Sequence, residues 1–454
     1  MRKIIEKQLK FGQRDIDKIK INFESRDEIP QLLLGLQTIY NDPSLRQKVF
    51  RILKGIVPNN TSATNGRPGM DLWKILVLGT IRLNCNFDYD KLLEIANEHK
   101  TIREFLGHSI FEFDQRYRLQ TIKDNVILLT PEVMDEISAL VVELGHDILG
   151  KKGQPLSGRC DSFVVETDVH FPTDINLLWD AMRKVITLLA REFSKSELSE
   201  WRQHGYHLRK IKKLFNKANK LRNSNNEKEK TAAYRNYVNA SEKLIKRAGV
   251  DLHFVNMMNE GDVARRLAIS AYISDAERQI DQIRRRVFND EKIPHNEKVF
   301  SIFERHTEWI SKGKAGVSQE LGLRVCILED QHGFILHHRV MENETDEKVA
   351  VPMVSAAKKK FPDLKSCSFD KGFHSPDNQE KLAEFIERVF LPRKGRLSEA
   401  VKAIEQSTDF KTARSKHAAV ESGINALENH ALDRCPDHGS VSYTHLTLPT
   451  KRIV

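Results

Sequence analysis

Apolar residues recur at helical spacing through most of the first 150 residues. They line one side of residues 131–148, where Thr130 and Pro131 form a typical helix start. Residues 88–107 fit two short helices joined by a tight turn, a shape shared by DNA-reading helix-turn-helix units and ordinary helical hairpins. The pattern alone favours the hairpin.

The pattern changes after a linker at residues 151–158. Residues 159–169 have the pattern of a strand, and a long amphipathic helix follows from about Asp174. From about residue 320 the chain predicts two hairpin strands, a helix, a strand, a helix, a short strand and a final helix. These are residues 323–330, 334–341, 347–361, 364–370, 376–386, 388–392 and 412–431.

This order of elements predicts an α/β (α+β) fold, in which a mixed sheet carries helices and is interrupted after its first strand. The last residues, SYTHLTLPTKRIV, do not continue the pattern and resemble translated adaptor sequence. The expected parts are a helical N-terminal domain, a mixed α/β core in two pieces, a helical insertion and a suspected non-native tail. They cover residues 1–150, 151–175 plus 320–440, 176–319, and 441–454, respectively.

Composition narrows the class of protein. Hydrophobic residues make up 40% of the 454, enough for a sizeable core, and the mean hydropathy is −0.49. No apolar run approaches the ~18 residues of a membrane span, and the N-terminus does not resemble a signal peptide. Five scattered cysteines without a CxxC pair indicate a reducing cytoplasm rather than a disulfide scaffold.

Positive charge is concentrated in the middle of the chain. Residues 201–250 hold fourteen Lys and Arg against three Glu, an excess of eleven, while the whole chain carries +10. Aromatic residues such as Trp201, Tyr206 and Phe215 lie among these cations. A run of charge is usually a solvated face, but this bias favours a surface that follows the phosphates of a nucleic acid.

Three carboxylates lie where the predicted sheet could gather them. Asp161 is on the first strand, Asp370 ends the strand after the hairpin and its helix, and Glu421 is on the final helix. Oxygen ligands of this kind suit Mg²⁺, and a pair of such ions can clamp the reacting oxygens of a phosphoryl displacement. On spacing alone the alternative stands that Asp370 caps a turn and Glu421 is a solvated helix residue.

Five ordered segments carry a family resemblance: CDSFVVETDVHFPTDINLL, HTEWISKGKAG, LEDQHGFILHH, FDKGFHSPDN and AVESGINALENHALDRCPDHG. They resemble successive motif blocks of bacterial insertion-sequence transposases of the ISNCY-like group. These are DDE enzymes with an RNase H-like catalytic core. The similarity runs from about Met70 to Gly439, and the predicted order of elements agrees with such a core interrupted after its first strand.

The resemblance implies catalytic and metal-binding roles for Asp161, Asp370 and Glu421, with Mg²⁺ as cofactor and Mn²⁺ able to substitute. Phe163 stands where the family usually has Thr. Asp168 and Asp174 are nearby competitors for the first carboxylate. Asp161 is preferred because Asp168 matches a position that is usually Asn, and Asp174 reads as a helix cap.

The final helix departs from the family pattern Tyr-x2-Arg-x3-Glu-x6-Lys. Its positions hold Arg414, His417, Glu421 and Glu428, so the role of the trailing Lys does not carry over to Glu428. The cations expected to hold DNA come from the basic insertion, from the segment before the hairpin, and from both sides of the final catalytic motif. They are Lys210, Lys212, Lys213, Lys217, Lys312, Lys314, Arg393, Lys394, Arg396, Arg414 and Lys416.

The resemblance therefore implies a transposase that cuts transposon-end phosphodiesters and joins the freed 3′-hydroxyl to target DNA. Its partners would be the transposon ends, target DNA and further copies of itself, as a homodimer or larger assembly, in the bacterial nucleoid and away from membranes. Two other interpretations stay open from the sequence. One is a stand-alone nuclease on the same core, and the other is a decayed, non-catalytic DNA-binding protein.

Overall fold

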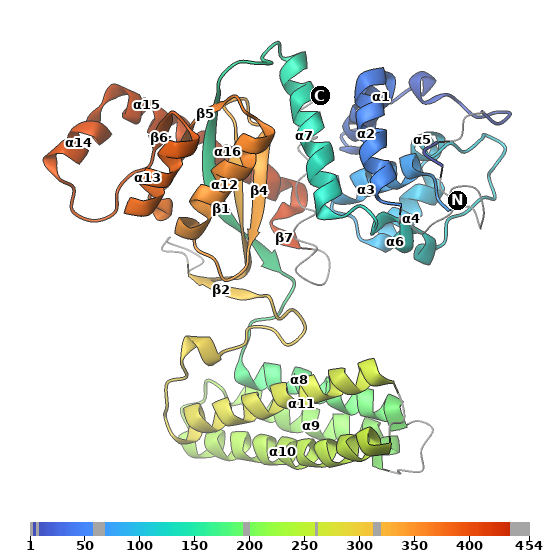
Figure 1. Cartoon of the computed structure of the whole chain (residues 1–454). Coiled ribbons are helices and arrows are strands. Elements are labelled where there is room, and N and C mark those ends of the chain that lie inside the picture. The colour runs from blue at the N-terminus through green and yellow to red at the C-terminus, as the bar shows by residue number, and fades with distance from the viewer. Residues whose placement is uncertain are drawn as a thin grey trace. The chain divides into compact units, whose positions relative to one another are not determined.

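The computed structural model describes residues 3–5, 9–57, 69–193, 200–258, 262–311 and 319–435. The chain divides into two compact units, one formed by Met1–Asp168 with Ile310–Val454 and the other by Val169–Trp309 (Figure 1). Residues 441–454, the suspected tail, lie outside the described residues. Along the described parts of the chain, no helix is both long and apolar enough to cross a membrane.

The first unit begins with seven helices around one apolar cluster. Its centre is α3, in which every residue from Ile75 to Ile81 is buried, and the Trp73 indole N–H donates to the Phe105 carbonyl at 3.0 Å. The expected pair of short helices is confirmed, with only His99 between them. The helices are α1 (Ile29–Asn41), α2 (Pro43–Gly55), α3 (Leu72–Asn84), α4 (Tyr89–Glu98), α5 (Lys100–Phe105), α6 (Leu119–Val126) and α7 (Pro131–Ile148).

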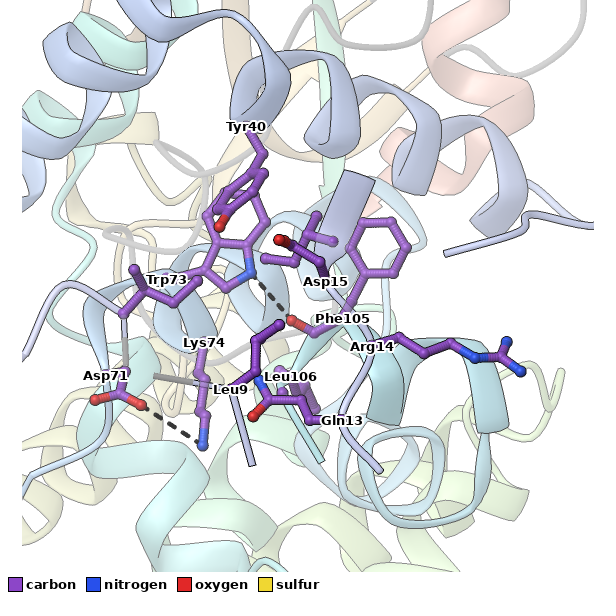
Figure 2. Close-up of a pocket in the computed structure, with 13 residues that line it drawn as sticks. Leu9, Gln13, Arg14, Asp15, Tyr40, Asp71, Trp73, Lys74, Phe105 and Leu106 are labelled. Carbon is purple, nitrogen blue, oxygen red and sulfur yellow. Dashed lines mark hydrogen bonds and ion pairs between the residues drawn. The ribbon is translucent and has the colours of Figure 1, made fainter. Parts of the chain in front are cut away.

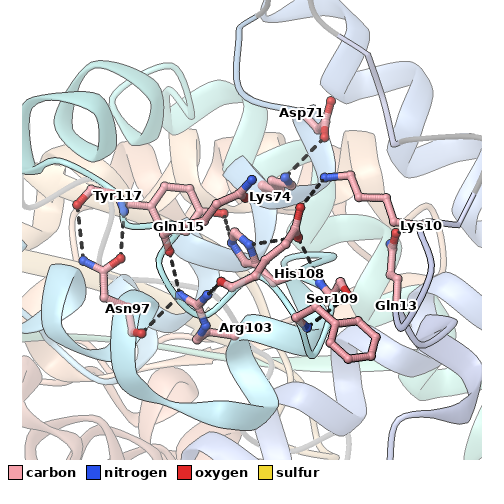
Figure 3. A network of polar contacts seen from close by, with 12 residues as sticks. Lys10, Gln13, Asp71, Lys74, Asn97, Arg103, His108, Ser109, Gln115 and Tyr117 are labelled. Atoms are coloured by element: carbon pink, nitrogen blue, oxygen red, sulfur yellow. Dashed lines mark hydrogen bonds and ion pairs between the residues drawn. The ribbon is translucent and has the colours of Figure 1, made fainter.

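A polar network joins the start of the chain to the segment after α5 (Figure 3). The Arg103 guanidinium donates to the carbonyl oxygens of Asn97, Glu112 and Gln115 at 3.2, 2.6 and 3.0 Å. The Glu112 carboxylate accepts a hydrogen bond from Lys10 Nζ at 3.0 Å. One arginine therefore joins the end of α4 to two carbonyls of the segment after α5, which fixes the path of that segment.

The sheet of this unit has seven strands in the order β2-β3-β1-β5-β6, with β4 also paired to β3 and β7 to the end of β1. β1 is antiparallel to β3 and parallel to β5, and β3 is antiparallel to β4. The predicted hairpin and mixed sheet are confirmed. The strands are β1 (Leu156–Thr167), β2 (Glu308–Ser311), β3 (Gln319–Glu329), β4 (Ile335–Met341), β5 (Leu364–Phe369), β6 (Arg388–Phe390) and β7 (Arg434–Cys435).

Side chains of β1 alternate between two apolar layers, as the pleat of a strand requires. Cys160 belongs to the layer that includes Met353 of α12 (Asp346–Lys360). Phe163 and Val165 belong to the other layer, which includes Val420 of α16 (Ala419–Leu427). Odd-numbered residues of β1 therefore face α16, and even-numbered residues face α12.

The final helix expected over residues 412–431 is wrong as a single element. It starts earlier, at Thr408, and the chain forms α15 (Thr408–His417), α16 and then a π-helical turn, Glu428–Leu432. The break at Ala418 coincides with a contact from β1, because Arg159 Nη1 donates to the Lys416 carbonyl at 3.3 Å. The Lys416 carbonyl also accepts the backbone N–H of Ala418, so the arginine adds a second hydrogen bond at the carboxyl end of α15, where a cation is favoured. The preceding helices are α13 (Pro376–Phe385) and α14 (Glu399–Gln406).

A buried polar contact attaches α7 to the sheet. The His146 Nε2 and Asp330 Oδ2 atoms lie 2.5 Å apart, and Asp330 Oδ1 accepts the backbone N–H groups of His332 and Phe334 at 2.8 and 2.9 Å. A Cβ at Gly145 would lie 2.6 Å from the Phe334 ring, so the helix approaches the hairpin turn closely. The hairpin turn thus binds the N-terminal helices through fully paired polar groups.

The second unit is a bundle of four helices, which lie side by side in Figure 1. Its core includes Leu178 and Ile186 of α8, Tyr237 of α10 and Ile269 of α11. The helices are α8 (Asp174–Glu192), α9 (His204–Lys220), α10 (Glu227–Met258) and α11 (Val263–Ile283). Besides Glu428–Leu432, the short 3₁₀ and π segments in the described residues are Ile16–Lys18, Glu200–Gln203, Arg284–Phe288, His295–Glu297 and Lys371–Phe373.

Replacing Gly322 by Ala should destabilise the sheet. A Cβ there would lie 2.1 Å from the Val165 carbonyl oxygen on the paired strand, and backbone cannot move aside without breaking the β1–β3 ladder. We expect a loss of roughly 3 kcal/mol in the free energy of unfolding, measured by urea denaturation.

The matched control is Gly35→Ala in α1, where a Cβ meets nothing within 4 Å. This variant should gain about 0.5–1 kcal/mol, because alanine is the better helix former. Equal effects at the two positions would contradict the close approach at Gly322.

Candidate active site

Two of the three predicted carboxylates are brought together by strand pairing. In the parallel pair of β1 and β5, Cys160 lies opposite Phe369. The next residues along the two strands are Asp161 and Asp370, so they occupy neighbouring positions at the end of β5. Asp161 is half-buried, while Asp370 is exposed and precedes the 3₁₀ turn Lys371–Phe373.

The third carboxylate, Glu421, belongs to the helix that covers the same face of the sheet. Glu421 is in the first turn of α16 and is exposed. The neighbouring Val420 is buried against Phe163 and Val165, which point to the same side of β1 as Asp161. The helix therefore carries Glu421 over the face on which Asp161 lies.

The charges of these neighbouring carboxylates affect the pKa of Asp161. Burial raises the pKa of Asp161 from 3.8 to about 6; a hydrogen bond from the Ser162 N–H lowers it, and the charges of Asp370, Asp346 and Glu421 raise it. Neighbouring carboxylates repel one another when they are ionised. Such a cluster is arranged to gain from a cation or from a proton shared among its members.

Asp346, the first residue of α12, is a fourth carboxylate that the sequence analysis missed. It lies on the other face of β1, where its Oδ1 accepts the Ser162 hydroxyl at 2.7 Å. The only signal in the sequence was that Asp346 follows Thr345 at the start of a predicted helix. An acidic residue there is usually explained by its favourable interaction with the helix dipole. Its contact with β1 could not be inferred, because Ser162 lies 184 residues away in sequence.

The turn after Asp370 is held from two sides. A Cβ at Gly372 would lie 3.0 Å from Asp346 Oδ2, so a larger residue there would push the Asp346 carboxylate outward by a few tenths of an ångström. The Lys394 ammonium donates to the Gly372 carbonyl at 2.8 Å and lies 3.8 Å from a Glu347 oxygen. Lys394, which we expected to contact DNA, is therefore engaged by the turn that carries Asp370.

His417, the last residue of α15, lies beside the carboxylates. A hydrogen bond of 3.0 Å joins its Nδ1 to Ser368 Oγ, two residues before Asp370 on the same strand. Burial lowers the pKa of His417, with Asp370 and Glu421 raising it and Arg159 lowering it. The same Arg159 forms an ion pair of 3.2 Å with the buried Glu329 of β3.

The competitors for the first carboxylate have other partners. Asp168 is exposed and ion-paired with Arg434. Asp174 is the first residue of α8 and lies 2.9 Å from an Arg286 nitrogen, while the neighbouring Thr173 side chain caps the helix. Neither belongs to the group of charges that acts on Asp161.

The remaining predicted residues are scattered over exposed surfaces. Arg393, Arg396, Arg414 and Lys416 are exposed in the first unit, and the four lysines of α9 are exposed in the second. Lys312 and Lys314 lie outside the described residues.

The residues of the cluster fit a divalent cation by their chemistry. Asp161, Asp370 and Glu421 offer the hard oxygen donors that Mg²⁺ prefers. Burial is the main cause of the raised pKa of Asp161, and the neighbouring carboxylates add a repulsion that a cation would relieve. Within the described ranges, no three His, Cys, Asp or Glu side chains are already set in the arrangement of a metal cage. Two of the three carboxylates are exposed, so their side chains can turn without disturbing the core.

A separate pocket lies among the N-terminal helices (Figure 2). It has a volume of about 90 Å³, and its lining includes Trp73, Phe105, Arg14 and an Asp71–Lys74 ion pair of 3.6 Å. The sequence-predicted site residues are absent from its lining.

Comparisons with protein-family models, curated proteins and solved structures found no match to this chain. The fold and the candidate site define a mixed α/β protein with a four-helix bundle inserted between two paired strands of its sheet. Its activity must be argued from the carboxylate cluster itself.

Replacing Asp161 by Asn should stabilise the cation-free protein at neutral pH. The pKa of Asp161 in the folded protein, about 6, exceeds the ordinary 3.8, so ionising this group favours the unfolded chain. Because one pKa unit corresponds to about 1.4 kcal/mol, the variant should gain up to about 3 kcal/mol above pH 6. Urea denaturation in EDTA at pH 7.5 and pH 4 measures the gain, which should shrink as the pH falls.

Asp114→Asn, a change at an exposed aspartate, is the control and should alter stability little at either pH. A gain for Asp161→Asn that is the same at pH 4 and pH 7.5 would mean that ionisation is not its cause.

Proposed function

We propose that this chain is a DNA transposase of the DDE class, with an RNase H-like catalytic core built around β1. The observation that carries the proposal is the gathering of Asp161, Asp370 and Glu421 on one face of the sheet. Strand register brings the first two together, and the field that acts on Asp161 includes all the others. The motif resemblance of the sequence independently assigns these three residues to the catalytic set.

The order of the strands supports the same core. β1, the β3–β4 hairpin, β5 and β6 follow one another in sequence, and the helical unit interrupts them after β1. This is the arrangement expected from the resemblance, an RNase H-like core interrupted after its first strand. The division into an N-terminal DNA-binding domain, a core and a basic insertion belongs to the same proposal.

In this proposal Asp161, Asp370 and Glu421 hold Mg²⁺, or Mn²⁺ in its place. When bound, such ions stabilise the charge that develops on a reacting phosphodiester. The water-derived nucleophile breaks the P–O3′ bond at the transposon end and leaves a 3′-hydroxyl and a 5′-phosphate. The 3′-hydroxyl then attacks a phosphorus of target DNA, forming a new phosphodiester and displacing the 3′-oxygen of the target strand.

The residues around the cluster support precise placement of Asp370. Asp346 closes over Gly372 on one side, and Lys394 donates to the carbonyl of Gly372 on the other. A turn fixed at both sides holds the backbone at Asp370 in place, and small displacements of a catalytic group are costly to rate. In the proposed reaction Lys394 is therefore a positioning residue for Asp370.

The basic face of α9 supports DNA as the partner. Ile211 and Ala218 are buried, while Lys210, Lys213 and Lys217, spaced three and four residues apart, are exposed on one side of the helix. In the described part of the chain these lysines and Lys212 have no acidic partner. Such unpaired cations attract phosphates at the cost of little desolvation. We further propose that the protein acts on DNA as a dimer or larger assembly, in the bacterial nucleoid.

The decisive experiment offers the protein a pre-cut DNA end with a free 3′-hydroxyl, taken from the DNA that flanks its gene, together with a plasmid target. In Mg²⁺ or Mn²⁺ the wild type should join the end to the plasmid. Asp370→Asn and Glu421→Gln should reduce joining by at least about 10³-fold while leaving end binding intact, because they remove charge stabilisation rather than DNA contacts.

Lys381→Gln serves as the control, since this exposed lysine pairs with Asp377 away from the cluster. Plasmid nicking without joining would instead support a stand-alone nuclease. DNA binding without either reaction would support a decayed DNA-binding protein.

Neutralising Lys210, Lys212, Lys213 and Lys217 to Gln should weaken DNA binding and flatten its dependence on salt. Each phosphate contact contributes about 0.9 to the slope of log K against log salt, so the slope should fall by as much as about 3–4. Fluorescence anisotropy across a salt titration measures it.

The matched control neutralises four lysines that already have acidic partners, the exposed Lys91, Lys381 and Lys402 and the partly exposed Lys365. If this set flattened the salt dependence as much as the α9 set does, the role of α9 would be contradicted.

A further inference from the structure

The imidazole of His417 presents one ring nitrogen with nothing bound to it. Its Nε2 is shut off from solvent and has no hydrogen-bond partner among the described residues. Its Nδ1 is engaged by Ser368 Oγ at 3.0 Å. A buried polar atom without a partner costs free energy, so its retention requires an explanation.

The hydrogen bonds around Ser368 indicate which nitrogen carries the proton. The Ser368 hydroxyl has a carbonyl acceptor at Gly158, 3.4 Å away, so the hydroxyl can accept the N–H of His417 Nδ1. In that arrangement Nε2 holds a lone pair. Burial also lowers the pKa of His417, which favours the neutral ring.

The unpartnered nitrogen lies in the field of the catalytic carboxylates. The charges of Asp370 and Glu421 both raise the pKa of His417, and Glu421 lies four residues further along the chain, in the first turn of α16. Ser368 precedes Asp370 by two residues on β5, so the two side chains share a face of the sheet. Among the described residues, no side chain donates a hydrogen bond to the carboxylate of Asp370 or Glu421.

We propose that His417 Nε2 is a nitrogen ligand of the divalent-cation site that Asp370 and Glu421 share, and that this ligand makes the site favour Mn²⁺ over Mg²⁺. Imidazole nitrogen binds first-row transition ions well, whereas Mg²⁺ prefers oxygen. The Ser368 hydrogen bond acts as the outer contact that orients a ligating imidazole and fixes its tautomer. This inference rests on the proposed function for the existence of the cation site, and it adds the identity of a ligand and of the preferred ion.

The test is pulsed electron paramagnetic resonance of Mn²⁺ bound to the full-length protein. Imidazole coordination gives nitrogen-14 couplings in the electron spin-echo envelope, and labelling the histidines with nitrogen-15 should change them to the nitrogen-15 pattern. We expect these couplings in the wild type and their loss in His417→Asn. The asparagine amide can retain the contact with Ser368 at the position of Nδ1, but it provides no atom at the position of Nε2.

Affinity gives a second measurement. Mn²⁺ binding, followed by the signal of the free ion, should weaken about tenfold in His417→Asn, while Mg²⁺ binding, measured by competition, should change less than about twofold. Ser368→Ala should keep the nitrogen couplings but weaken Mn²⁺ binding, because it removes only the orienting contact. Circular dichroism and thermal melting of each variant confirm that it folds, and the wild-type spectrum tests the proposal without any variant.

The outcomes separate this inference from the proposed function. Mn²⁺ binding that depends on Asp370, shown by its loss in Asp370→Asn, but gives no nitrogen couplings would overturn the role of His417 and leave the cation site standing. Mn²⁺ binding that is equal in wild type and Asp370→Asn, or absent from both, would overturn the site itself and the inference with it. Couplings that persist in His417→Asn would assign the nitrogen to another histidine and also overturn the proposal.

Discussion

The pairing of β1 on both of its edges is the constraint on which the candidate site depends. β3 pairs with one edge and β5 with the other, so β1 can neither slip nor rotate. A shift of one residue would move Asp161 to the α12 face and Ser162 to the α16 face. The register thereby decides which carboxylates meet: Asp161 with Asp370 and Glu421 on one side, and Ser162 with Asp346 on the other.

A buried ion pair connects this register to the helices above the sheet. Arg159 contacts Glu329 across the β1–β3 ladder, and its other terminal nitrogen binds the Lys416 carbonyl. A Cβ at Gly423 would lie 2.5 Å from Glu329 Oε2, so α16 descends onto the buried carboxylate only because that residue is glycine. Removing one partner of a buried ion pair would leave an uncompensated charge. The Arg159–Glu329 pair therefore stays in place, and α16 packs against it. The packing of α16 sets the position of Glu421, and the contact of Arg159 with Lys416 sets that of His417 at the end of α15.

Local signals in the sequence were sufficient for most elements and for two of the carboxylates. Thr130 and Ser375 cap α7 and α13 as expected, and the predicted strands place Asp161 within β1 and Asp370 directly after β5. The break at Ala418 was missed because its partner, Arg159, is 257 residues from Lys416 in sequence. The contacts of Asp346 and Lys394 were missed for the same reason: each depends on a residue that only the folded chain brings near. The apolar periodicities of strands and helices show which face of an element is buried, but they do not show which distant residues it contacts.

The helical unit is inserted between two strands that pair directly, and this has a consequence for how the chain folds. Glu166 of β1 lies opposite Gly322 of β3, with roughly 150 residues between them. Within the helical unit, the rings of Phe171 and Trp309, near its two ends, pack with centroids 5.6 Å apart. Once that unit has folded, the connection between β1 and β3 behaves as a short loop. Shortening the effective loop about tenfold lowers the entropic cost of closing it by about 2 kcal/mol. Folding of the helical unit thus brings the ends of β1 and β3 together, which should speed the pairing of two strands that are far apart in sequence.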